Sequence, residues 1–106
     1  MIIYNITFHV ENEALTKYLR YLKTTYIPKA TKSALLYEPC LRKILHDVPA
    51  EGTNLAVQFR AKDVDTLNYW LEKEGRFLHE DIAERFGSKV AGFSTLMEEM
   101  DLNCEE

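Results

Sequence analysis

The chain has 106 residues, 46% hydrophobic and 28% charged, which is the composition of one ordinary globular domain. No apolar run reaches the roughly 20 residues of a membrane helix, and no signal-peptide pattern opens the chain. We therefore expect a cytoplasmic protein without a membrane segment. Cys40 and Cys104 lack C-x-x-C spacing, and we expect no disulfide between them in a reducing compartment.

The formal net charge of −4 is unevenly distributed along the chain. Residues 98–106 contain five acidic side chains and no basic one, so we expect an acidic tail after a domain that spans residues 1–97. Seven basic residues lie between Lys17 and Lys43, where Glu38 is the single acid. This basic segment is either a solvated helix face or a docking surface for an acidic partner, including the protein's own tail.

The first ten residues predict a strand, because apolar side chains alternate along them. Its apolar face carries Ile2, Tyr4, Ile6, Phe8 and Val10. Its mixed face carries Ile3, Asn5, Thr7 and His9. A function that uses this strand would involve the mixed face.

A helix is expected next, with Asn12 as its N-cap and an apolar stripe over residues 15–26. Pro28 lacks a backbone N–H, so we expect a break near residues 25–27. We expect one or two further helical turns over residues 29–36, ended by Pro39, and then an edge strand over residues 40–46.

A third strand is predicted after a turn at residues 47–52. Its apolar face carries Leu55, Val57, Phe59 and Ala61, and its other face carries Asn54, Ala56, Gln58 and Arg60. Asp63 then caps a helix over residues 63–86, in which Gly75 leaves open a kink, and Gly87 ends it. A fourth strand is predicted from about residue 89 to residue 97.

The order β-α-β-β-α-β predicts an α+β fold, a ferredoxin-like sandwich with antiparallel sheet order 4-1-3-2. Both helices would cover the face of Tyr4 and Val57, leaving a second, half-apolar face open. Two copies packed through these open faces would form a dimeric α/β barrel, so we expect a homodimer. The alternative is a monomer with one solvated sheet face.

Three segments carry a family resemblance: Met1–Val10 (MIIYNITFHV), Glu51–Phe59 (EGTNLAVQF) and Val90–Met100 (VAGFSTLMEEM). The chain resembles a bacterial family of small domains of unknown function, and this resemblance implies no activity. Its expected topology is also similar to the dimeric α/β-barrel superfamily, which includes antibiotic-biosynthesis-type monooxygenases, haem-degrading enzymes and small-ligand-sensing domains. The second resemblance concerns the fold alone.

The haem-degrading branch uses an asparagine on the first strand with a tryptophan and a histidine on the second helix. In this sequence, the resemblance points to Asn5, Trp70 and His79 as a haem-type site. Nine residues along a straight helix are about 900°, which places Trp70 and His79 on opposite sides. An α/β-barrel-type monooxygenase, cofactor-independent or haem-linked, is therefore the alternative function, and its haem-linked form needs a kink at Gly75.

Other chemistry has little support in the sequence. His9, His46, His79 and Cys40 lack metal-ligand spacing, and no G-x-S-x-G elbow is present, so we predict no metal site and no cofactor. RNA-recognition modules share the expected topology but stack bases on aromatic side chains of their central strands. The open side of the third strand has no aromatic residue, so we predict no nucleic-acid partner.

The remaining candidates lie on the two central strands. Asn5, Thr7, His9, Gln58 and Arg60 are predicted to line either a ligand pocket or the dimer interface. In a pocket, Arg60 could bind a carboxylate or phosphate through its planar fork, and His9 could act as an acid or base. We therefore predict a homodimeric small-ligand-binding or interaction module, and whether it is an enzyme stays open.

Overall fold

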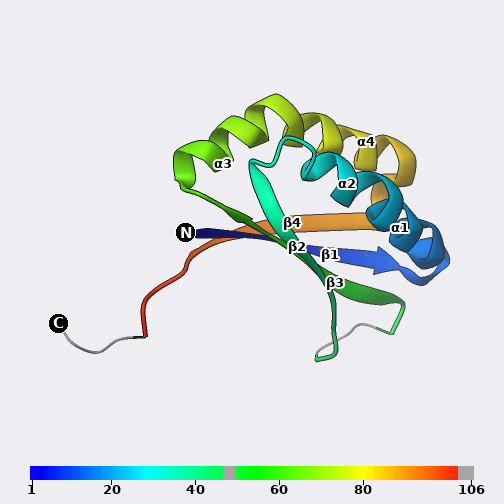
Figure 1. Cartoon of the computed structure of the whole chain (residues 1–106). Helices are drawn as coiled ribbons and strands as arrows, with labels where there is room; N and C mark the ends of the chain where they lie inside the picture. The colour runs from blue at the N-terminus through cyan, green and yellow to red at the C-terminus, as the bar shows by residue number, and fades with distance from the viewer. Residues whose placement is uncertain (47–49, 103–106) are drawn as a thin grey trace.

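The computed structural model describes residues 1–46 and 50–102 and contains one antiparallel sheet with strand order β2-β3-β1-β4. The strands are β1 (Ile2–Glu11), β2 (Leu36–Ile44), β3 (Gly52–Ala61) and β4 (Val90–Glu98). Figure 1 shows the helices together on one face of this sheet. The structure confirms the predicted α+β ferredoxin-like sandwich, because 2-3-1-4 is the expected order read from the other edge.

The strand register assigns the residues of each face. Asn5 of the central strand β1 is paired with Gln58 of β3 and with Thr95 of β4. Because side chains alternate along a strand, residues directly opposite one another point to the same face. The predicted division of β1 and β3 into a core face and an open face is therefore confirmed. In this article, the open face comprises Ile3, Asn5, Thr7, His9, Asn54, Ala56, Gln58, Arg60, Ala91, Phe93, Thr95 and Met97.

The first helical run is continuous across the predicted break. It consists of η1 (Asn12–Ala14), α1 (Leu15–Tyr21), the π-helical turn η2 (Leu22–Tyr26) and α2 (Ile27–Ala30). Pro28 lies in the first turn of α2, just after this wider turn. A first-turn position tolerates a missing N–H and the fixed φ of proline, so the predicted break was wrong.

Asn12 does not cap the first helix, contrary to the prediction. Its side-chain Nδ2 donates instead to the carbonyl oxygen of Ala50, over 3.3 Å, and its backbone N–H donates to the Glu51 carbonyl oxygen. Asn12 therefore fixes the end of β1 to the loop before β3. A long-range contact has replaced the local one.

Strand β2 begins at Leu36, earlier than predicted, and continues through Pro39. Its register with β3 shifts between Tyr37 and Cys40, where Glu38 has a φ of 49°. An edge strand tolerates a bulge and a proline because one row of its backbone groups is not needed for pairing. The helical turns expected up to residue 36 end instead at Ala30, and Pro39 lies inside β2 rather than before it.

The second helical run consists of α3 (Val64–Trp70), the π-helical turn η3 (Leu71–Gly75) and α4 (Arg76–Phe86), followed by η4 (Gly87–Lys89). The predicted cap is confirmed, because the Asp63 carboxylate accepts the backbone N–H of Thr66 over 2.8 Å. This hydrogen bond is the main reason that the pKa of Asp63 is lowered. Gly87 ends the run with a φ of 57°.

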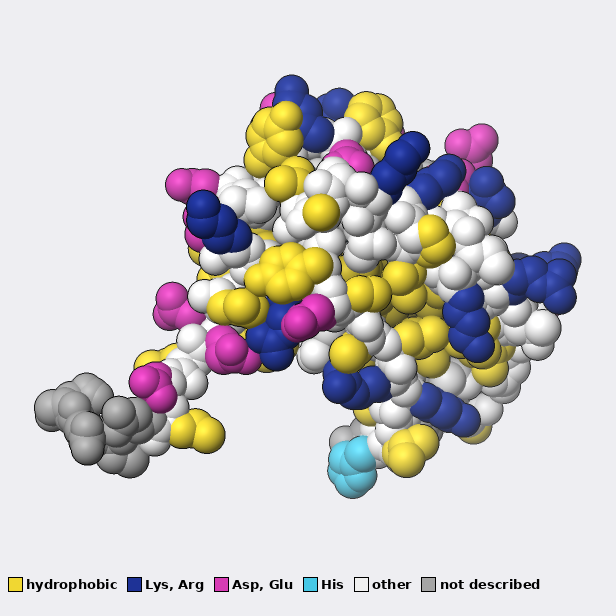
Figure 2. All heavy atoms as spheres, in the orientation of Figure 1, with side chains coloured by type: hydrophobic (Ala, Val, Ile, Leu, Met, Phe, Trp, Pro, Cys, Tyr) yellow, Lys and Arg dark blue, Asp and Glu magenta, His cyan; other side chains and the backbone are white. Residues whose placement is uncertain are grey.

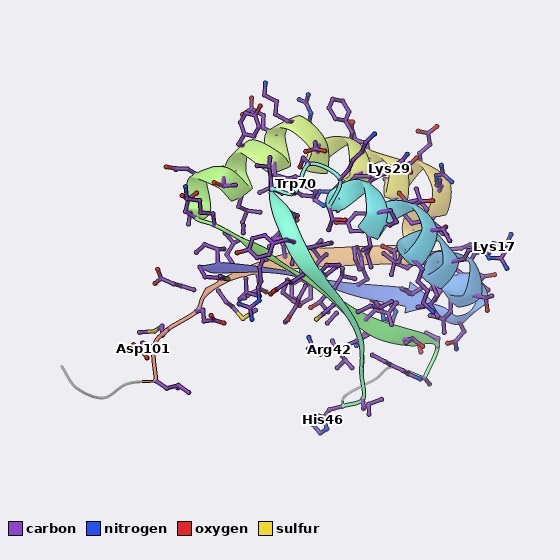
Figure 3. All side chains as sticks on the ribbon, in the orientation of Figure 1. Lys17, Lys29, Arg42, His46, Trp70 and Asp101 are labelled. Atoms are coloured by element: carbon purple, nitrogen blue, oxygen red, sulfur yellow. The ribbon has the colours of Figure 1, made fainter. Side chains whose placement is uncertain are left out.

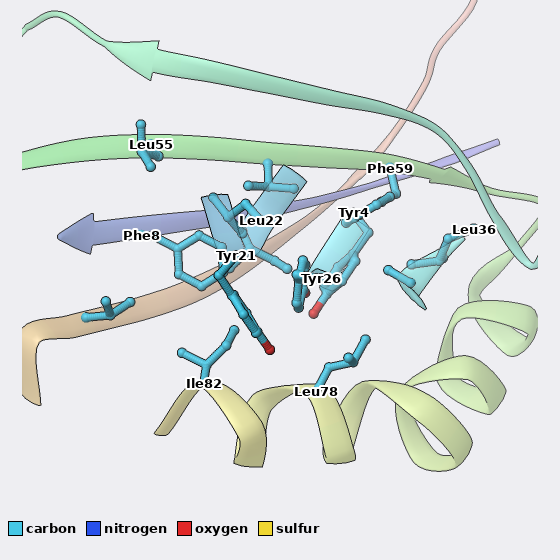
Figure 4. Close-up of a cluster of buried hydrophobic side chains, with 14 of the residues drawn as sticks. Tyr4, Phe8, Tyr21, Leu22, Tyr26, Leu36, Leu55, Phe59, Leu78 and Ile82 are labelled. Atoms are coloured by element: carbon cyan, nitrogen blue, oxygen red, sulfur yellow. The ribbon is translucent and has the colours of Figure 1, made fainter. Parts of the chain in front are cut away.

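An aromatic core lies between the sheet and the helices (Figure 4). Tyr4 and Phe59 stack on adjacent strands, and Tyr4 meets Trp70 edge to ring at 6.0 Å between centroids. Phe8 contacts Tyr18 in the same edge-to-ring manner. Aromatic rings bury large apolar areas, so they account for much of the stability of this small domain.

None of the helices in the described part of the chain is long and apolar enough to cross a membrane. Cys40 is a half-buried free thiol. Cys104 lies outside the described residues.

Candidate functional site

Asn5 lies near the centre of the open face and is nearly buried, with 8% of its surface exposed. Its Nδ2 donates to Thr7 Oγ1 over 3.1 Å. Its Oδ1 is buried and has no hydrogen-bond partner among the described residues. A buried amide oxygen without a donor costs roughly 1–3 kcal/mol. The structure therefore leaves an unfilled acceptor at the middle of this face.

His9 lies at one end of the same strand and is engaged by its neighbours. Its Nδ1 is 2.9 Å from Asn54 Oδ1 on β3, so Nδ1 donates to that amide oxygen. The ring also lies against Gly52, where an added Cβ would come within 2.4 Å of His9 Cε1. His9 is thus held in place by contacts within the chain.

Arg60 lies at the other end of the open face and already binds two carboxylates. Its Nε is 2.8 Å from Glu38 Oε2, and its Nη1 is 3.0 Å from Glu99 Oε1. The hydrogen bond to Glu99 is the main reason that the pKa of Arg60 is raised. The fork predicted to bind a ligand anion is therefore occupied by the chain's own side chains.

The five predicted pocket residues do not converge on one point. Asn5, Thr7 and Gln58 are close, and Gln58 Oε1 accepts from Arg42 Nη1 on β2 over 3.2 Å. Arg60 is opposite Ile3, and His9 is six residues farther along β1, or roughly 20 Å at 3.3 Å per residue. One small ligand does not reach both ends.

The three residues of the haem-type set also stay apart. Asn5 points to the open face, whereas Trp70 contacts Tyr4 on the opposite face of the sheet. Trp70 is fully buried, and its indole N–H donates to the Ala30 carbonyl oxygen. His79 is on α4, at the edge of a separate groove. Figure 3 shows Trp70 within the helical layer, above the sheet.

That groove, here called the α4 groove, lies between α4 and strands β1 and β4 and has a volume of about 380 Å³. Its sheet side is formed by Tyr4, Ile6, Phe8, Val90, Gly92, Phe93 and Ser94, and its helix side by His79, Ile82, Ala83 and Gly87. Burial lowers the pKa of His79, which favours its neutral form. The groove combines an apolar lining with one imidazole, as many small-molecule sites do.

The α4 groove is the site that the sequence analysis missed. Gly92 and Ser94 are directly opposite Phe8 and Ile6 on β1, so both face the helices. A Cβ at Gly92 would lie 2.8 Å from Phe8 Cδ1, so this glycine allows the ring to approach β4. Two small residues on the core face of a strand are the signal that could have revealed the groove.

Residues 1–46 and 50–102 contain no cluster of three or more histidine, cysteine, aspartate or glutamate side chains suited to a metal ion.

The fold and the open sheet face define this chain as a ferredoxin-like α+β protein. Residues 1–100 match the model of a family described as a domain of unknown function, DUF4286, and the chain belongs to that family. No curated protein sequence is significantly similar to it.

Solved structures with the same fold are distant in sequence. A candidate antibiotic biosynthesis monooxygenase from Deinococcus radiodurans is 14% identical, with TM-score 0.70, covering 100% of this chain and 99% of its own. The cofactor-independent oxygenase SnoaB from Streptomyces nogalater is 10% identical, with TM-score 0.68 and 98% of both chains covered. A dimeric ferredoxin-like protein from an uncultured marine organism is 12% identical, with TM-score 0.60, covering 97% of this chain and 100% of its own. At these identities, the similarity concerns the fold alone.

Proposed function

We propose that this protein is a homodimeric small-ligand-binding module whose two copies pack through their open faces as an α/β barrel. The observation that carries the proposal is the exposure of two large apolar side chains, Phe93 and Met97, on that face.

Both side chains belong to β4, the edge strand beside β1. Phe93 is 66% exposed and Met97 is 39% exposed, because no element of the chain covers this face of β4 in the described residues. Large apolar side chains beside a buried amide are typical of a surface that another protein covers. One solved relative is named a dimeric ferredoxin-like protein, which agrees with this proposal.

Asn5, Thr7, His9, Gln58 and Arg60 then belong to the dimer interface rather than to one ligand pocket. His9 and Arg60 lie near opposite ends of this face, and each is already positioned by partners within the chain. We place the ligand in the α4 groove, where the lining is apolar and His79 offers one polar group. An aromatic or aliphatic molecule with one hydrogen-bonding group suits this lining.

Sedimentation analysis tests the assembly. We expect the native protein to sediment as a dimer at micromolar concentration. Phe93→Asp would place a charge in the interface and weaken the dimer at least about 100-fold, or about 2.7 kcal/mol. Phe77→Asp is the matched control, because Phe77 is 55% exposed on α4, on the other side of the molecule. A monomeric native protein, or equal effects of both variants, would contradict the dimer.

A neutral fluorescent probe, N-phenyl-1-naphthylamine, tests the groove separately. Its fluorescence should rise on binding to the native protein. Ser94→Leu should abolish that rise because the added side chain fills the space between β4 and α4, whereas Ser94→Ala should keep it. Equal binding by Ser94→Leu would exclude the groove as the site while leaving the dimer proposal intact.

A monooxygenase is the second candidate function, and the position of His79 in the α4 groove supports it. Two solved relatives named a monooxygenase and an oxygenase share the fold. Haem binding would give a Soret shift that His79→Ala removes, whereas cofactor-independent chemistry would consume oxygen with an enolisable aryl ketone such as anthrone. If neither signal appears, the ligand-binding proposal is favoured over the enzyme.

A further inference from the structure

A second pocket lies on the other side of α4, where its last turn approaches the first helical run. Its volume is about 340 Å³. This pocket, here called the basic pocket, is lined by Lys17, Arg20, Tyr21, Thr24, Thr25, Arg85 and Phe86. This pocket shares no lining residue with the α4 groove.

The electrostatics of the basic pocket are one-sided. Three of its lining side chains are cationic, and none is a carboxylate. Within the described residues, Lys17 and Arg20 form no ion pair with an acidic side chain. Figure 2 shows dark blue Lys and Arg side chains gathered on the side of α1 and β2, while the acidic ones cluster where the chain leaves β4. Arg85 is paired with Asp81, whereas Lys17 and Arg20 are close like charges without counter-charges, and such a pair favours an anionic ligand.

Arg85 is held in a fixed orientation at this pocket. Its Nε is 3.0 Å from Asp81, and its guanidinium lies over the ring of Tyr21 at 5.2 Å from the centroid. Tyr21 in turn donates its hydroxyl to Asp81 over 2.7 Å. Because Asp81 engages Nε, both terminal Nη groups stay available, and they are the donors of a bidentate fork.

The π-helical turn η2 supplies polar groups to the same pocket. Thr24 and Thr25 both line it, and the Thr24 hydroxyl donates to the Arg20 carbonyl oxygen over 2.7 Å. This bond keeps the Thr24 side chain against its own helix. With its proton on that carbonyl, Thr24 Oγ1 accepts from the Thr25 hydroxyl over 3.5 Å, a long bond that a phosphate oxygen could replace.

We propose that the basic pocket binds a small phosphate-bearing molecule, with Arg85 as the oriented fork and Lys17 and Arg20 as flanking charges. A phosphate group presents the several acceptor oxygens that this set of donors matches, and it carries the charge that balances them. The site is independent of the dimer and of the α4 groove.

Titration with inorganic pyrophosphate, followed by amide NMR shifts and calorimetry, tests this proposal. We expect shifts confined to residues near 17–25 and 85, and Arg20→Gln should weaken binding at least tenfold. Lys23→Gln is the matched control, because it removes one charge from the same helical run but does not line the pocket, and it should change binding less than twofold. Arg85→Gln should also weaken binding, with its fold checked by circular dichroism.

Three outcomes would overturn the proposal. Pyrophosphate could cause no localised shifts. Arg20→Gln and Lys23→Gln could weaken binding equally, which would mean diffuse attraction to a basic surface. A poly-glutamate peptide could bind where pyrophosphate does not, and this would identify the surface as a docking site for an acidic protein segment.

Discussion

Trp70 donates its indole N–H to the carbonyl oxygen of Ala30 over 3.0 Å, and both residues are fully buried. Ala30 ends α2 and Trp70 ends α3, so this hydrogen bond joins the two helical runs. The ring of Trp70 also packs against Tyr4 of the sheet. One side chain therefore connects all three parts of the core.

Trp70→Phe should destabilise the protein by about 2–3 kcal/mol. The change leaves the buried Ala30 carbonyl oxygen without a hydrogen-bond donor, which costs roughly 1–3 kcal/mol of stability. It also leaves a cavity beside the smaller ring. Urea denaturation measures the loss. Tyr69→Phe is the control, because Tyr69 is 56% exposed, and it should stay within about 0.5 kcal/mol of the native protein. Equal stabilities of the two variants would disprove the role of Trp70.

Gly75→Ala should destabilise the protein, although alanine is the better helix former by about 1 kcal/mol. A Cβ at position 75 would lie 2.6 Å from Cζ3 of the buried Trp70 ring. Overpacking of this kind costs roughly 1–3 kcal/mol. Thermal unfolding would show a lower Tm. A higher Tm would mean that the ring can move aside at little cost.

Tyr26 and Tyr21 should respond in opposite ways to loss of their hydroxyls. The Tyr26 hydroxyl is buried without a partner in the described residues, so Tyr26→Phe should stabilise the protein by about 1 kcal/mol. Tyr21 donates to Asp81, so Tyr21→Phe should destabilise it by a similar amount. Paired urea titrations give both values, and a destabilised Tyr26→Phe variant would reveal a partner for that hydroxyl.

The tyrosine core predicts a loss of stability at alkaline pH. Burial raises the pKa of Tyr4 to about 12 and also raises the pKa of Tyr18 and Tyr26. In the unfolded chain these groups lose their protons near pH 10, so the unfolded state binds fewer protons than the folded state above that pH. Their contribution is therefore complete below pH 10 and decreases as the pH rises.

Unfolding free energies at pH 8, 10 and 11 would measure this effect. Each such tyrosine contributes a slope of at most about 1.4 kcal/mol per pH unit above pH 10. Tyr26→Phe should reduce the total slope by about that amount. An unchanged slope in this variant would mean that Tyr26 ionises equally in both states.

Substitutions of Glu38 measure how much stability the positive φ at the bulge in β2 costs. Its φ of 49° is unfavourable for most side chains and free of cost for glycine. Glu38→Gly and Glu38→Val both remove the carboxylate from Arg60, so their difference isolates the backbone conformation. Glu38→Gly should be the more stable variant by about 1–2 kcal/mol, because a β-branched residue opposes positive φ. Equal stabilities would show that the bulge rearranges.

The sequence by itself determined the sheet and its two faces. Alternation along β1 and β3 places Tyr4 and Val57 in the core and Asn5 and Gln58 on the open face, because side chains alternate over neighbouring residues. The helix cap at Asp63 could also be predicted from the sequence, because its partner Thr66 is only three residues away. The predicted assembly and location stay predictions.

Only the tertiary structure decided the features that depend on residues far apart in the sequence. Asn12 binds the loop before β3 instead of capping its helix, and Arg60 binds Glu38 and Glu99 instead of presenting an empty fork. The α4 groove exists because Gly92 on β4 lies opposite Phe8 on β1. The periodicity of apolar residues in the sequence indicates only which face of a strand or helix a residue occupies. The partner that it meets there is set by strand register and by how the helices pack on the sheet.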